Sequence, residues 1–405
     1  MSPGRLRLGD VERARAVLAG HLRPTPLRRS GAAPGVDLRL KLECWQPTGS
    51  FKVRGAIHFL STLSEEERRR GVVAASAGNH ALGVAFAASR LGGSVRARLF
   101  VPRTAPRSKV DKLRLFPVEV QEWGDTYDDA VEAAHACERE TGAVYVPAYE
   151  DQRTAAGQGT VGLEVLDECP EVGAVLVPVG GGGLIAGIGL ALKTLKPKIR
   201  IIGVQAESLP SMKAALEKGE PVGLPPALTI ADGIAVRTVG AAPLELVKSF
   251  VDEIVTVDEG EIANAVLLLL EIEKSVAEGA AAVPLAALLN KKISLDGTNV
   301  GLIVSGGNID VNLIARIIEK GLIQDGRLSR VSVVIPDRPG NLARLAQRIA
   351  DLGANILQIA QARGFGQMAI GETEVELILE TTGPEHIERL CAGLRAEGLR
   401  FKTES

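Results

Sequence analysis

The sequence predicts an α/β protein with two open parallel sheets, followed by a small domain of β-α-β-β-α-β order. From Gly71 to about Leu322, short β-rich segments alternate with amphipathic helical segments, which is typical of parallel sheets covered by helices on both faces. After about residue 328 the order of the segments changes. With 405 residues the chain is too long for one ordinary core, so we expect two or three domains.

Strands and helices alternate regularly in the first region. Ligands of parallel sheets bind beyond the carboxyl ends of the strands, so the loops that follow the strands are where we expect functional residues. The expected strands cover residues 72–77, 96–102, 143–149, 174–180, 199–207 and 300–308, and the expected helices cover 79–92, 126–140, 183–196 and 261–274.

The last part of the chain holds a second, shorter set of elements. A turn with the sequence DRPG (337–340) separates its first strand from its first helix. The order of the elements is that of a ferredoxin-like domain. The expected strands cover 330–335, 355–363, 373–381 and 399–402, and the expected helices cover 341–353 and 384–398.

Composition and charge argue against several classes of function. The formal charge is −2, from 47 basic and 49 acidic residues, so we expect no nucleic-acid and no membrane partner. The four cysteines show neither metal-ligand spacing nor disulfide density, which is typical of reduced thiols in a cytosol. The first twenty residues lack the apolar core of a signal peptide, and no apolar run is long enough to span a bilayer. We therefore expect a cytoplasmic protein.

A first unusual loop has the sequence PTGSFKVRG (47–55). Ser50 can cap a helix that starts near Phe51, which would place Lys52 in the first turn. A cation is unfavourable at the positive end of a helix dipole. An amine held as an imine by an aldehyde cofactor would fit such a place. The alternative is an exposed surface lysine after a turn.

A second loop, Ser76-Ala77-Gly78-Asn79-His80, lies between an expected strand and an expected helix. Its small residues allow a ligand to approach the backbone closely. The N–H groups and the hydroxyl would favour a carboxylate or a phosphate. The alternative is a tight turn with Asn79 or Ser76 as the helix cap.

A third loop, Gly180-Gly181-Gly182-Gly183-Leu184, opens an expected helix. Four consecutive glycines are entropically costly, and one would suffice for a turn. A row of N–H donors at a helix start suits a phosphate. The spacing is neither the G-x-G-x-x-G of a dinucleotide site nor that of a P-loop. We expect a phosphate site here, with bare turn geometry as the alternative.

Together the three loops describe pyridoxal phosphate with an amino acid bound to it. At this point the sequence resembles the threonine dehydratases (threonine ammonia-lyases) of the fold-type II pyridoxal-phosphate enzymes, over roughly residues 10–320. The tail resembles an ACT regulatory domain, with DRPG and GANI (353–356) at the expected places. The motifs that carry the main resemblance are PTGSFKVRGA (47–56), SAGNHALGVA (76–85), VGGGGLIAG (179–187), ADGIAV (231–236), EGA (278–280) and SGGN (305–308).

The resemblance implies a domain organisation. It predicts two open parallel-sheet domains, of which the larger binds the cofactor and the smaller is mobile. The large domain would comprise residues 1–71 and 150–322 and the small domain 72–149. A linker at 323–327 would lead to the ACT domain at 328–405.

The resemblance also implies roles for individual residues. Lys52 would form the imine and act as the general base, Asn79 would bond the ring 3′-oxygen, and Ser305 would meet the pyridine nitrogen. A hydroxyl partner leaves that nitrogen largely unprotonated, which suits β-elimination. The expected cofactor contacts are Lys52, Phe51, Asn79, Gly180, Gly181, Gly182, Gly183, Leu184, Gly233 and Ser305. The expected substrate contacts are Ser76, Ala77, Gly78, Asn79 and His80.

Four positions modify this expectation. Ala77 stands where related serine racemases have a serine, so we expect a lyase with negligible racemisation. Leu82 replaces the usual glutamine of the family, and Pro284 interrupts an expected helix. Relatives that require a cation carry a second acid shortly after the residue that matches Glu207. This sequence has none there, so we expect no divalent metal site.

The expected reaction converts L-threonine or L-serine to 2-oxobutanoate or pyruvate and ammonia. The closest alternatives are another fold-type II activity, such as 3-hydroxyaspartate ammonia-lyase, threonine synthase or a serine-preferring dehydratase, and an inactive amino-acid sensor. The presence of both Lys52 and Ser305 argues against the sensor.

The C-terminal segment indicates two kinds of partner, a second copy of the chain and a small effector. A β-α-β-β-α-β module leaves one sheet face uncovered, so we expect a homo-oligomer, either a dimer or a tetramer. We also expect an amino-acid effector such as isoleucine or valine; the alternative is a domain that only assembles the oligomer. The residues expected at the effector are Asp337, Gly340, Asn341, Leu342, Asn355 and Ile356.

Overall fold

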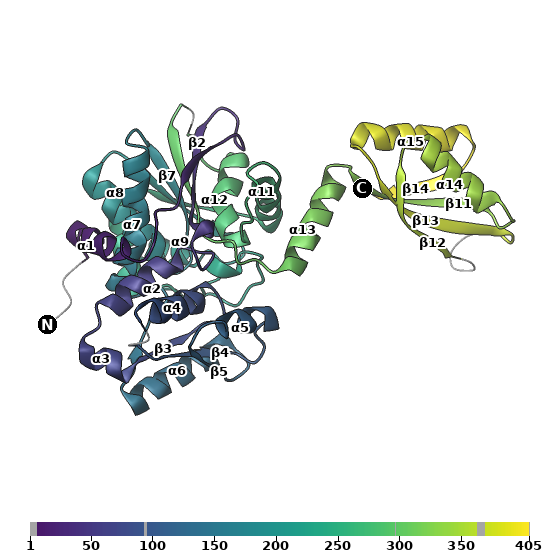
Figure 1. Cartoon of the computed structure of the whole chain (residues 1–405). Coiled ribbons are helices and arrows are strands. Elements are labelled where there is room, and N and C mark those ends of the chain that lie inside the picture. Colours follow the sequence, from purple (N-terminus) through teal and green to yellow (C-terminus); the bar gives the residue numbers. More distant parts are fainter. Residues whose placement is uncertain (1–5, 93–94, 296, 363–368, 405) are drawn as a thin grey trace. The chain divides into compact units, whose positions relative to one another are not determined.

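The computed structural model describes residues 6–404 except 93–94, 296 and 363–368. It divides into two units, residues 1–309 and 310–405 (Figure 1). This division differs from the expected one, because helix α13 (Val311–Gln324) belongs to the second unit and reaches into the expected linker. Asp310 caps this helix through the backbone N–H of Asn312, which explains why the chain turns helical there.

The first unit contains a six-stranded sheet in the order β1-β2-β10-β7-β8-β9. All neighbours are parallel except β1 and β2. Every residue of the central strand β7 is buried, as expected for a parallel sheet with both faces covered. The strands are β1 (Leu27–Ser30), β2 (Asp37–Leu42), β7 (Ala174–Pro178), β8 (Arg200–Ala206), β9 (Glu253–Val257) and β10 (Asn299–Val304).

A second, four-stranded parallel sheet of the same unit has the order β5-β4-β3-β6. The strand expected at 143–149 is only two residues long, and its pairing with β3 ends at the Val146 N–H, which donates to the Val73 carbonyl at 2.9 Å. The strands are β3 (Val72–Ala75), β4 (Ala97–Val101), β5 (Glu119–Glu122) and β6 (Val144–Tyr145).

Several helices of the first unit begin at signals that are local in the sequence. Capping boxes join Ser64 with Glu67, Thr126 with Asp129, and Asp258 with Glu261, which satisfies N–H groups at each helix start. The helices are α1 (Leu8–Leu18), η1 (Glu43–Trp45), α2 (Lys52–Ser61), α3 (Glu65–Arg70), α4 (Asn79–Arg90), α5 (Arg107–Leu113), α6 (Tyr127–Thr141), α7 (Gln152–Glu168), α8 (Gly183–Leu195), α9 (Ser211–Lys218), η2 (Asp232–Ile234), α10 (Ala241–Phe250), α11 (Glu259–Glu271) and α12 (Gly279–Leu289).

Helix α2 connects the two sheets of the first unit. It packs against α4, which covers the four-stranded sheet, and against α7, which covers the six-stranded sheet (Figure 1). The contact with α7 is close: a Cβ at Gly157 would lie 2.7 Å from the carbonyl oxygen of Arg54. The first residue of α2 is Lys52, so the packing of α2 fixes where this lysine lies.

A buried ion cluster anchors α2 and β2 to α7. The Arg54 guanidinium donates to both carboxylate oxygens of Glu43, each at 2.7 Å, and to those of Glu164 at 2.6 and 2.7 Å. Lys41 adds ion pairs of 2.8 Å to Glu164 and Glu168. The side chains of Lys41, Glu43 and Arg54 are at most 1% exposed. Arg54 and Glu43 therefore depend on each other for compensation of their charge.

The second unit folds as an antiparallel sheet in the order β12-β13-β11-β14. This confirms the predicted β-α-β-β-α-β order after residue 328. Buried and half-buried residues alternate along β13, so one face of the sheet faces a core with the helices. The elements after α13 are β11 (Leu328–Pro336), α14 (Asn341–Asp351), β12 (Asn355–Ala362), β13 (Glu372–Glu380), α15 (Pro384–Ala396) and β14 (Arg400–Glu404).

Two further expectations concern helices and membranes. Pro284 does not end α12, which continues through it from Gly279 to Leu289. In the part of the chain that the structure describes, no helix is long and apolar enough to cross a membrane.

Candidate functional site

A cavity of about 950 Å³ opens in the first unit, a size typical of small-molecule sites. Its lining includes parts of all three unusual loops. Every residue predicted for the cofactor or the substrate lies on it: Phe51, Lys52, Ser76, Ala77, Gly78, Asn79, His80, Gly180, Gly181, Gly182, Gly183, Leu184, Gly233 and Ser305.

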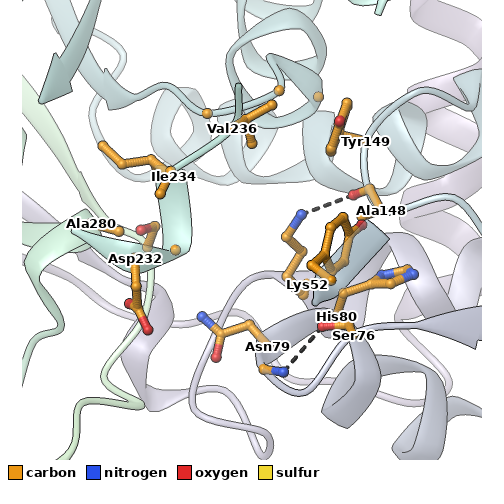
Figure 2. Close-up of a pocket in the computed structure, with 18 of the residues that line it drawn as sticks. Lys52, Ser76, Asn79, His80, Ala148, Tyr149, Asp232, Ile234, Val236 and Ala280 are labelled. Carbon is orange, nitrogen blue, oxygen red and sulfur yellow. Dashed lines mark hydrogen bonds between the residues drawn. The ribbon is translucent and has the colours of Figure 1, made fainter. Parts of the chain in front are cut away.

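Lys52 lies in the first turn of α2, as predicted, and its side chain points into the cavity (Figure 2). The expected cap is wrong: Phe51 occupies the N-cap position, and the buried Ser50 hydroxyl has no partner among the described residues. Phe51 N–H instead donates to the carbonyl of Ser305 at 3.0 Å, which ties the helix start to the end of β10.

The Lys52 amine is held in a place that favours its neutral form. Nζ donates to the carbonyl oxygen of Ala148 at 2.8 Å (Figure 2). Burial lowers the pKa of Lys52 to about 8, although the carboxylate of Glu278 acts in the opposite direction. A lysine with this pKa is partly neutral just above pH 7, which a nucleophilic or basic amine requires.

The glycine loop opens α8, and Gly182 is its N-cap with φ +92°. Close packing against Tyr149 disfavours a side chain at Gly181 and at Gly183. A Cβ at Gly181 would overlap the ring of Tyr149, and a Cβ at Gly183 would lie 3.0 Å from the Tyr149 carbonyl oxygen. The first N–H groups of a helix have no intrahelical partners, so the loop offers donors at the positive end of α8.

We expect the substitution Gly181→Ala to weaken cofactor binding about tenfold or more, because the new methyl group displaces either the loop or the Tyr149 ring. Titration of the cofactor-free protein with pyridoxal phosphate, followed by absorbance, measures the Kd. The matched control is Gly31→Ala, where a Cβ meets nothing within 4 Å. An unchanged Kd in the Gly181 variant would contradict the packing argument.

The loop at 76–80 leads into α4, with Gly78 rather than Asn79 or Ser76 as the N-cap. The Ser76 hydroxyl accepts from the Gly78 N–H at 3.1 Å. His80 Nε2 donates to the carbonyl of Val146 at 2.8 Å, and burial lowers the pKa of His80 to about 4. The imidazole is therefore neutral at pH 7 and shapes the loop.

Asn79 points into the cavity beside a carboxylate to which the sequence reasoning gave no role. Its Nδ2 lies 2.8 and 3.1 Å from the two carboxylate oxygens of Glu278, and its Oδ1 accepts from Asn308 Nδ2 at 2.8 Å. Burial raises the pKa of Glu278 to about 7. The only sequence signal for Glu278 is its place in the motif EGA (278–280).

Gly233 lies in η2 and approaches the same carboxylate: a Cβ there would lie 3.0 Å from the Ala280 Cβ and 3.1 Å from Glu278 Oε1. Gln158 is a second lining residue that sequence reasoning missed. Its Oε1 accepts from Gly55 N–H at 3.1 Å, and its buried Nε2 has no partner in the described part of the protein. An unpaired buried donor at the lining is a group that a polar ligand can satisfy.

Leu82 also lines the cavity, in place of a polar side chain, and packs in the core shared by α2 and α4. No group of three or more His, Cys, Asp or Glu side chains is arranged to hold a metal ion within the described residues.

The residues expected at an effector lie in two segments of the second unit. Gly340 is the N-cap of α14, and Asn341 Nδ2 donates to the Pro336 carbonyl at 2.9 Å. Asn355 Nδ2 donates to Glu380 Oε2 at 3.2 Å at the start of β12. Asp337 and Leu342 belong to the first segment and Ile356 to the second.

A lysine of lowered pKa and a glycine-rich helix start on one cavity of an α/β fold define a site for an aldehyde cofactor that carries a phosphate. Residues 18–306 match the family model of the pyridoxal-phosphate dependent enzymes, and the chain belongs to this family. The fold-type II expectation is thereby confirmed, as is pyridoxal phosphate as the cofactor.

One curated protein and two solved structures show which kinds of enzyme this chain is similar to within the family. The L-threonine ammonia-lyase of Thermotoga maritima is 46% identical over 400 residues, which cover 98% of this chain and 99% of that protein. The processed form of threonine deaminase isoform 2 from Solanum lycopersicum has a TM-score of 0.72 and 34% identity, over 77% of this chain and 86% of that chain. Maize serine racemase has a TM-score of 0.73 and 34% identity, over 78% of this chain and 98% of that chain.

The lining residues fit the family's cofactor. The glycine loop offers donors for a phosphate, the Lys52 amine can react with an aldehyde, and Asn79 and the unpaired Gln158 amide are further polar groups at the lining. Tyr149 packs against Gly181 and Gly183, and all three residues line the cavity.

Proposed function

We propose that the protein is a pyridoxal-phosphate dependent threonine ammonia-lyase, which converts L-threonine, and also L-serine, to a 2-oxo acid and ammonia. The observation that supports this most is that Lys52, the glycine loop and the 76–80 loop line a single cavity. The likeness to L-threonine ammonia-lyases over nearly the full chain supports the choice of substrate.

The cofactor supplies an electron sink that acidifies the α-carbon of a bound amino acid. Lys52 would hold the cofactor aldehyde, and its Nζ would take the α-proton once it is free. Its lowered pKa suits this, because a neutral amine is needed to accept a proton.

The remaining loops would hold and orient the ligands. The N–H groups from Gly180 to Leu184 would bind the phosphate at the start of α8, and Ser305 would face the pyridine nitrogen. The backbone of the 76–80 loop, with Ser76, would bind the substrate carboxylate. Ala77 has no side-chain proton to give, so the opposite face of the α-carbon would have no acid.

The test is a direct assay of the purified, cofactor-loaded protein with L-threonine, L-serine and L-threo-3-hydroxyaspartate. We expect 2-oxobutanoate from threonine, pyruvate from serine and no D-serine. A protein that prefers 3-hydroxyaspartate would be another fold-type II lyase, and one that turns over none of the three would refute the proposal.

We further propose that the second unit is an ACT domain that binds a branched-chain amino acid near Asn341 and Asn355 and pairs with a second copy in a homo-oligomer. We expect deletion of residues 310–405 to remove any response of threonine turnover to 1 mM isoleucine or valine, a concentration of the order at which weak regulatory sites fill. An unchanged response would refute the regulatory role. Sedimentation of the truncated protein would show whether this unit only assembles the oligomer.

A further inference from the structure

The hydrogen bonds around Asn79 form a chain with a defined direction. It begins at the Thr48 carbonyl, which can only accept and takes a hydrogen from Asn308 Nδ2 at 2.7 Å. The second hydrogen of this Nδ2 goes to Asn79 Oδ1 at 2.8 Å. Asn79 Nδ2 then faces the Glu278 carboxylate, which also accepts the Asn308 backbone N–H at 3.2 Å.

The charge of Glu278 is what makes this arrangement unique. An ionised carboxylate only accepts, so the nitrogen of the Asn79 amide must face it. The two hydrogens of an amide nitrogen diverge too widely for a single carboxylate to accept both in good geometry. One hydrogen of Asn79 is therefore left for another acceptor, and Asn79 lies on the cavity wall.

We propose that Glu278 is a positioning residue: its ionised carboxylate fixes the Asn79 amide so that an N–H is presented to the cofactor. This inference rests on the proposed function of the site and goes beyond it by assigning to Glu278 a role that it exerts through Asn79. Protonation of Glu278 removes the negative charge that orients the amide and turns one carboxyl oxygen into a donor. The amide is then no longer held in one orientation.

The surroundings of Glu278 determine where it titrates. Burial raises its pKa to about 7, and Asp232 of η2 adds to this effect. The Asn79 amide lowers the pKa, as do the Asn308 N–H and Lys109 of α5. The other titratable groups that interact with it are Lys52 on α2 and Cys44 on η1. The carboxylate form, and with it the fixed amide, is therefore expected above pH 7 and lost below it.

The decisive comparison uses Glu278→Gln, which keeps the shape and removes the charge, and Glu278→Asp, which keeps the charge. Two quantities are measured between pH 6 and 9: the Kd for pyridoxal phosphate of the cofactor-free protein, and kcat/KM of the loaded enzyme. We expect the wild type to lose both affinity and kcat/KM as the pH falls through about 7. Glu278→Gln should bind about tenfold more weakly at pH 8, because a hydrogen bond to a charged group is lost. Its loss of affinity below pH 7 should be smaller than that of the wild type, because the contribution of Glu278 is gone while protonation of the Lys52 amine remains. Glu278→Asp should restore the loss of affinity below pH 7 to that of the wild type.

A double-mutant cycle with Asn79→Ala separates positioning from a purely structural role. If Glu278 acts through Asn79, the double variant binds the cofactor no more weakly than Asn79→Ala alone, within about twofold. The matched control is Glu273→Gln, another buried glutamate, which accepts from the Ser30 hydroxyl at 2.6 Å and lies outside the cavity lining. It should leave the Kd and the pH profile unchanged.

Independent effects of the two single variants, or a loss of affinity below pH 7 in Glu278→Gln as large as that of the wild type, would overturn the proposal. If Glu278→Gln does not fold, the pH dependence of the cofactor Kd in Asn79→Ala decides, since a loss of affinity below pH 7 as large as that of the wild type excludes action through the amide. The Kd is measured without substrate, so a failure of the proposed threonine chemistry does not affect this outcome.

Discussion

Replacing Lys52 by alanine is expected to lower kcat/KM for L-threonine by about 10³-fold or more, because the variant loses both the covalent hold on the cofactor and the proton acceptor. No other described lysine combines a place on the cavity wall, a first-turn position in α2 and a pKa lowered to about 8. Initial rates of 2-oxobutanoate formation measure the effect.

Two further measurements test whether Lys52 is the lysine that binds the cofactor. The wild type should show a visible absorption band from the bound cofactor, and borohydride should fix the cofactor to the peptide that contains Lys52, as detected by mass spectrometry. The control Lys218→Ala, at an exposed position, should keep the band and the rate. Borohydride labelling of any other lysine would refute the assignment.

Replacing Arg54 by methionine is expected to destabilise the first unit by about 3–5 kcal/mol, because Glu43 would remain buried without its partner. Arg54 holds the pKa of Glu43 below its ordinary value, against the effect of burial. A carboxyl with a depressed pKa contributes stability that is present above its unfolded pKa and lost as the pH falls through its folded pKa. The deficit of the variant should therefore be largest near pH 7 and shrink toward pH 4.

Urea unfolding followed by tryptophan fluorescence measures this change. The chain has two tryptophans, Trp45 and Trp123, and both lie in the first unit, so the signal reports that unit even if the second unfolds separately. Arg69→Met, on the exposed face of α3, is the control and should change stability by less than about 0.5 kcal/mol. The double variant Arg54→Met with Glu43→Leu should recover part of the loss, whereas a shift of the urea midpoint no larger than that of the control would contradict the prediction.

The parts of the fold that sequence predicts well are those with local causes. Thr126 with Asp129 and Asp258 with Glu261 mark helix starts within four residues, and the apolar run 174–178 is a fully buried strand. The glycine run at 180–183 could likewise be placed at a helix start, because its entropic cost has to be offset by a function or by close packing.

The parts that sequence could not predict depend on distant contacts. Asn79 and Glu278 are 199 residues apart, and neither residue alone signals that they meet. Gln158 comes to the cavity only because α7 packs tightly on α2. The division at residues 309 and 310 differs from the expected boundary because it depends on the contact of α13 with β11, which the sequence of α13 does not indicate.

The hydrogen bond from Lys52 to Ala148 has a consequence for how the protein acquires its cofactor. Ala148 follows β6 by a few residues, so the lysine bridges the start of α2 and the end of a strand of the four-stranded sheet. A covalent bond from Lys52 to the cofactor aldehyde would take the place of this hydrogen bond, so the contact between α2 and the end of β6 would change when the cofactor binds.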